Sequence, residues 1–109
     1  MSLRTDFTGG LDTAINAAIA AGIAFGTTNQ ASISTALTNA AALGQTTVTF
    51  SANEAHNAAG MALEGNIWNA YKSGLINYFA DQDIMYSEVA FTIATVDGST
   101  NQVTVTFTF

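Results

Sequence analysis

Residues 51–79 constrain the fold of this chain more than any other stretch, because they carry a long helical repeat. Apolar residues recur there at every fourth position, which places them on one face of a helix; they are Ala55, Ala59, Leu63, Ile67, Tyr71, Leu75 and Phe79. Ser51 and Glu54 fit a capping box, in which the two side chains satisfy the first backbone N–H groups of a helix. The spacing therefore predicts one unbroken helix over 51–79, with its apolar face against a core.

Two alanine-rich segments before this stretch also have helical spacing. The first predicted helix begins near Thr5 and ends in the region 22–26, where glycines interrupt the pattern; its apolar stripe is Phe7, Leu11, Ile15, Ile19 and Ile23. The second predicted helix is capped by Thr28 or Asn29 and runs to Leu43. The related segments TAINAAIAAG and TALTNAAALG indicate two similar helices that form a hairpin.

Alternating threonine predicts three strands, at 46–50, 86–96 and 102–109, with the last two forming a hairpin around the turn 97–101. In the last strand, Phe107 and Phe109 fall on the same side as the valines, and we expect both to face the core. The predicted fold is α+β: two Ala-rich helices, a short strand, one long helix and a C-terminal β-hairpin. The helices are expected to pack on one face of a small, mainly antiparallel sheet.

The direction of the first two strands depends on the connection between them. An unbroken helix over 51–79 returns the chain across the sheet and makes these strands parallel, whereas a break at 64–66 makes them antiparallel. The four-residue spacing continues across Gly65, which favours the unbroken helix.

Length and charge limit the classes of function. The 109 residues fit a single domain, 1–109, with one core. Only 9% of the residues are charged, against about 25% in typical soluble domains, and none lies between 13 and 53. A net charge of −6 with one Lys and one Arg argues against nucleic acid as a partner. The apolar run 14–26 is too short for a membrane span, so we expect a soluble protein whose compartment the sequence does not assign.

No set of residues in the sequence indicates an enzyme. His56, the only histidine, has no evident acid–base partner, and the chain lacks cysteine. Asp81, Asp83 and Glu88 form an acidic turn whose spacing does not match a calcium loop. We interpret this turn as solvated, with weak cation binding as the alternative. The sequence thus predicts no catalytic residue, no cofactor and no metal site.

The aromatic part of the long helix offers a candidate partner surface. Trp68 and Tyr71 are three residues apart and close to Lys72, and aromatic residues dominate binding hot spots. Burial in the core is the other interpretation, because aromatic side chains contribute large areas to cores. A second candidate surface lies on the two alanine-rich helices, at Ala18 and Ala40, where small side chains let helices approach closely.

In composition and in its final strand, VTVTFTF, the chain resembles small virion proteins of tailed bacteriophages. Such proteins are often rich in Ala, Thr, Asn and Gly, free of cysteine and poor in lysine. The resemblance implies a non-enzymatic structural or assembly subunit of a capsid, neck or tail, and it assigns no functional residue. We predict a homo-oligomer that contacts other virion proteins and assembles through the alanine-rich helices, with Trp68 or the threonine face of the sheet as a secondary contact. The alternative is a small-ligand-binding domain or enzyme that uses the aromatic helix and the acidic turn.

Overall fold

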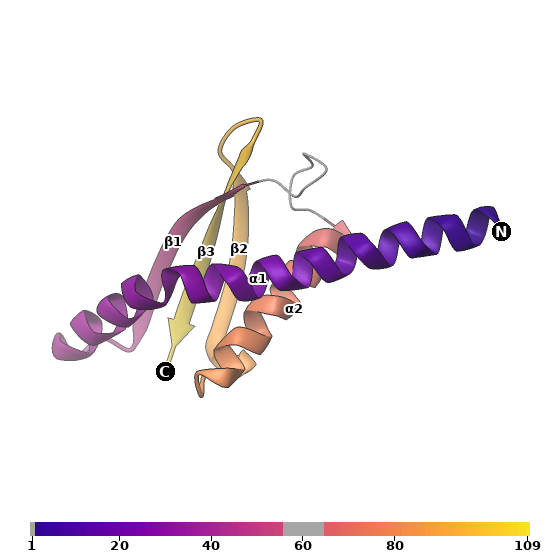
Figure 1. Ribbon diagram of the computed structural model, residues 1–109. Helices are drawn as coiled ribbons and strands as arrows, with labels where there is room; N and C mark the ends of the chain where they lie inside the picture. The colour runs from indigo at the N-terminus through magenta and orange to yellow at the C-terminus, as the bar shows by residue number, and fades with distance from the viewer. Residues whose placement is uncertain (1, 56–64) are drawn as a thin grey trace.

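The computed structural model describes residues 2–55 and 65–109. Its elements, in order, are α1 (Leu3–Ala42), β1 (Thr47–Ala55), α2 (Gly65–Asp81), the short 3-10 helix η1 (Tyr86–Glu88), β2 (Val89–Thr95) and β3 (Thr100–Thr108). The strands form one antiparallel sheet in the order β1-β3-β2. Both helices cross the same face of this sheet (Figure 1). The fold is therefore α+β, as the sequence predicts.

Residues Leu3–Ala42 form one helix of 40 residues, α1, instead of the predicted hairpin of two helices. Gly22 and Gly26, which suggest a helix end in the sequence, are buried inside α1. A Cβ atom at Gly22 would collide with the backbone carbonyl oxygen of Tyr71, and one at Gly26 would collide with the ring of Tyr78. These glycines therefore let α2 approach α1 closely. In the sequence alone, a glycine with this role cannot be told from a glycine that ends a helix.

Polar side chains in the middle of α1 bond to carbonyl groups of the same helix, and they include Asn29, one of the two residues predicted to cap a second helix. Asn29 Nδ2 donates to the Phe25 carbonyl at 2.8 Å, and Thr35 Oγ1 donates to the Ala31 carbonyl at 3.0 Å. Both bonds span four residues, so the side chains are satisfied without ending the helix. The N-terminal cap is Ser2, whose hydroxyl oxygen accepts the Thr5 N–H at 3.1 Å.

The predicted helix over 51–79 is wrong in its first part. Residues 51–55 belong to β1, and the Ser51 hydroxyl lies 2.8 Å from the Thr104 hydroxyl on β3 instead of capping a helix. The alternation of Val48, Phe50 and Ala52 continues the strand pattern, and it outweighs the four-residue spacing that begins at Ala55. Ala59 and Leu63, with His56, lie outside the described residues.

The second part of the predicted 51–79 helix forms α2, which begins at Gly65. This start lies at 64–66, the place that the sequence analysis gave as the alternative position of a break. Gly65 has a φ of 56°, a left-handed conformation that glycine adopts without strain. The apolar stripe is confirmed along α2, because Tyr71, Leu75 and Phe79 are all buried. Together with Phe25 of α1 they form the helical side of the core.

The central strand β3 organises the sheet. Both β1 and β2 pair antiparallel with it, so these two strands run in the same direction without being neighbours. Val103, Val105 and Phe107 are completely buried beneath the helices, and the alternate residues carry threonine on the other face. The expectation that Phe109 faces the core is wrong. It follows the end of β3, remains 55% exposed and stacks against Phe107 with 6.2 Å between ring centroids.

Candidate functional site

The most unusual feature of the molecule is the first part of α1, residues 3–17, which we call the α1 arm. Figure 1 shows this part of the helix extending past the end of α2 and away from the sheet. No residue of the arm is buried, whereas buried residues recur along α1 from Ala18 to Ala40. The radius of gyration is 15.6 Å, against about 13 Å for a compact domain of this length. The 40-residue helix α1, which includes the arm, runs the length of the molecule and accounts for this elongation.

The uncovered arm continues the apolar face of α1. Phe7 precedes Phe25 by 18 residues, which is five full helical turns, so the two side chains leave the helix in the same direction about 27 Å apart. Phe25 is 1% exposed in the core, and Phe7 is 67% exposed. Leu3, at 89% exposed, extends the same stripe, and Leu11 and Ile15 are half-buried. Among the residues that the structure describes, the core-facing side of α1 is therefore left uncovered at the outer end of the arm, at Leu3 and Phe7.

A groove lies at the other end of α1, between α1 and the last turn of α2, and we call it the α1–α2 groove. Its volume is about 240 Å³. Its apolar lining consists of Ile33, Leu37, Phe79 and Ile84, and its polar lining of Gln30, Ser34, Thr38, Tyr78 and Gln82. Gln30 Nε2 lies 3.5 Å from Gln82 Oε1 across it. Tyr78 is 8% exposed, and its hydroxyl has no hydrogen-bond partner in the described part of the chain. Burial raises the pKa of Tyr78, so the hydroxyl stays protonated.

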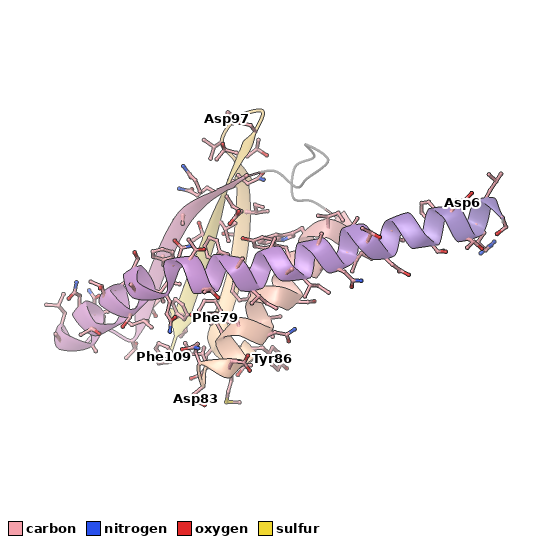
Figure 2. All side chains as sticks on the ribbon, in the orientation of Figure 1. Asp6, Phe79, Asp83, Tyr86, Asp97 and Phe109 are labelled. Atoms are coloured by element: carbon pink, nitrogen blue, oxygen red, sulfur yellow. The ribbon has the colours of Figure 1, made fainter. Side chains whose placement is uncertain are left out.

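The acidic turn borders this groove, since Gln82 of the groove lies between Asp81 and Asp83. Figure 2 shows Asp83 at the end of α2, far from Asp6 on the arm. Glu88 turns inward and accepts the Met85 N–H at 2.9 Å, which caps η1. Within 2–55 and 65–109, no three His, Asp or Glu side chains come together as a metal site would require. The turn therefore presents its two aspartates to solvent beside an apolar groove.

The predicted aromatic partner surface is largely part of the core. Tyr71 is completely buried, and its hydroxyl donates to Glu54 Oε2 at 3.2 Å. Burial, the charge of Glu54 and this hydrogen bond all raise the pKa of Tyr71. Trp68 is half-buried and stacks on Tyr71 at 5.7 Å, and Lys72 Nζ lies 5.5 Å from the Trp68 ring centroid. Trp68 and Lys72 thus cover a core tyrosine through stacking and a cation–π contact, and neither lines the groove.

Ala18 and Ala40 also require a correction. They are 4% and 5% exposed, because their side of α1 packs inside the same molecule. A charge at either position would be buried and would destabilise the fold. The exposed apolar surface that the sequence analysis did not single out is the arm, and its signal was the continuation of the apolar stripe from Ile15 back to Phe7.

Comparison with known proteins identifies no relative: no family model, curated protein or solved structure matches this chain. Among the helices of the described residues, only α1 is long and apolar enough to cross a membrane by length and composition. Its second half, however, contributes Phe25 and Ile33 to the core, and its arm carries Arg4, Asp6 and Asp12. The second half of α1 is therefore a core helix of this domain, and the first half carries charges that membrane-spanning segments seldom contain.

Proposed function

We propose that this protein is a non-enzymatic structural subunit that acts by self-association, as a repeated component of a tailed-bacteriophage capsid, neck or tail. The observation that carries the proposal is the α1 arm, with Leu3 and Phe7 exposed on the continuation of a core face. The outer turns of the arm, around Leu3 and Phe7, have little packing to support them, and short helical segments without packing are marginally stable in water. A partner that covers the apolar stripe would therefore stabilise both the side chains and the helix.

The edges of the sheet support the same proposal. Strands β1 and β2 each have one unpaired edge in the three-stranded sheet. Natural sheets usually protect such edges with lysine, proline or bulges. Here β2 contains no charged residue, and β1 contains only Glu54, which bonds to Tyr71. Copies can therefore approach these edges without burying unpaired charges.

The low charge of the chain also favours contact between copies. No ionisable side chain lies between 13 and 53, a range that covers most of α1 and nearly all of β1. The net charge of −6 resides outside this range, so contacts made by residues 13–53 bring no like charges of this range together. The assignment to a virion rests on the resemblance in composition described above.

The mass in solution tests self-association. Light scattering coupled to gel filtration at micromolar concentration is expected to give at least twice 11.3 kDa for the wild-type chain. Phe7→Asp is expected to reduce the mass to that of one copy, because it places a charge on the apolar stripe. The fold should survive, since Phe7 contributes little to the core.

Thr5→Asp is the matched control. Thr5 is exposed and lies about 160° around the helix from Phe7, and an added aspartate near a helix N-terminus is favourable. This variant should keep the wild-type mass. A wild-type chain that remains at 11.3 kDa throughout the micromolar range would count against the proposed function.

A further inference from the structure

We propose, on the basis of the self-association above, that the α1 arm of one copy docks into the α1–α2 groove of the next copy, so that copies join head to tail. The occupant of the groove is thus a second copy of this chain. Phe7 would enter the groove, and Arg4 would lie against the acidic turn.

The two surfaces match in apolar character. The groove is lined on one side by Ile33 and Leu37 of α1 and on the other by Phe79 and Ile84, and about 240 Å³ accommodates one aromatic side chain. Phe7 is the aromatic residue of the arm, and it is exposed at the centre of the stripe. Aromatic anchors that fill pockets are the usual centres of protein interfaces.

The charges beside these surfaces are also complementary. Arg4, the only arginine of the chain, precedes Phe7 by three residues and therefore lies near it on the helix surface. Asp81 and Asp83 are exposed and flank Gln82, a residue of the groove lining. With Phe7 in the groove, Arg4 would pair with these carboxylates, and such rim pairs set the register and speed of association.

The geometry of α1 requires that the two surfaces belong to different copies. Phe7 and Ser34 of the groove are 27 residues apart on one continuous helix, which separates them by about 40 Å. An arm therefore cannot reach the groove of its own copy. A contact between two different surfaces repeats from copy to copy and builds a ring or a filament, whereas a symmetric arm-to-arm contact would stop at a dimer.

Complementation between two variants tests this arrangement. Phe7→Asp disables the arm and leaves the groove intact, and Ser34→Arg blocks the groove, from an exposed helical position, and leaves the arm intact. Each variant alone is expected to be monomeric. An equimolar mixture is expected to give the mass of two copies and no more, because only one arm and one groove remain functional. Thr35→Arg, a change at the adjacent exposed residue outside the groove, is the control and should assemble like the wild type.

Several results would overturn the head-to-tail arrangement. If Ser34→Arg assembles like the wild type while Phe7→Asp does not, the arm binds elsewhere, and self-association survives without this inference. A mixture that stays monomeric leads to the same conclusion. A wild-type monomer would remove both proposals.

A charge exchange provides an independent test that leaves the apolar contacts unchanged. Arg4→Glu is expected to weaken association about tenfold, and adding Asp81→Lys in the same chain should restore it. If Arg4→Glu has a reduced mass and the double variant does not recover the wild-type mass, Arg4 does not contact the acidic turn. Circular dichroism spectra matching the wild type would establish that each variant is folded.

Discussion

Phe107→Ala is expected to lower the free energy of unfolding by about 3–5 kcal/mol. Phe107 is completely buried on the central strand β3, opposite Val48 of β1 and Val89 of β2. Its ring packs edge-on against Phe79 of α2, with 5.3 Å between centroids. Because these neighbours belong to three different elements of the fold, β1, β2 and α2, they cannot all move to fill the cavity that alanine would leave.

Phe109→Ala provides the matched control, since it makes the same change two residues later in the chain. Phe109 is 55% exposed and contributes mainly its stacking on Phe107, so the expected loss is about 1 kcal/mol or less. Urea unfolding followed by the fluorescence of Trp68 would measure both losses. The protein concentration must be the same throughout, because assembly also stabilises the folded state. Equal losses for the two variants would contradict the placement of the core on this strand.

Gly22→Ala is expected to destabilise the protein by about 2 kcal/mol or more, although alanine normally favours helices. The added Cβ would collide with the carbonyl oxygen of Tyr71. Gly74 stands in the reciprocal position, because a Cβ there would collide with the carbonyl oxygen of Ile19. Both obstacles are backbone atoms that cannot rotate away, so α1 and α2 would have to separate.

Gly9→Ala should have the opposite effect. Gly9 lies in the arm, and a Cβ there would meet nothing within 4 Å. The same substitution should therefore stabilise the helix by about 0.5–1 kcal/mol. Thermal unfolding of the two variants under identical conditions would compare them. Midpoints that shift in the same direction would show that the close contact between the helices at Gly22 is wrongly placed.

The existence of the three strands could be predicted from sequence because their signal is local, but their ends could not. The strand predicted at 46–50 runs on to Ala55, and the first three residues of the strand predicted at 86–96 form η1. Alternation places Val103, Val105 and Phe107 on one face whatever surrounds them, and the structure buries all three. The helix boundaries depend on other parts of the fold. Gly22 suggests a helix end until the partner helix that contacts it is known, and Ser51 fits a helix cap and a strand equally well.

The exposed apolar face of the arm was harder to predict for a related physical reason. Alanine is common both inside and outside proteins, so Ala18 and Ala40 carried no information on which side of α1 is buried. The apolar spacing of Phe7 was recognised, but whether this side chain is covered depends on where α2 begins. Because α2 begins at Gly65, no residue of the described part of α2 covers Phe7, which is 67% exposed.

Amide hydrogen exchange along α1 tests most directly whether the arm is an assembly surface. At a concentration where copies associate, amides of residues 5–17 are expected to be protected on the order of a hundredfold more than after dilution. Protection around Phe25 should change much less, because this part of α1 is covered within one copy. Arm amides that exchange equally fast at both concentrations, while the mass shows an oligomer, would contradict assembly through the arm.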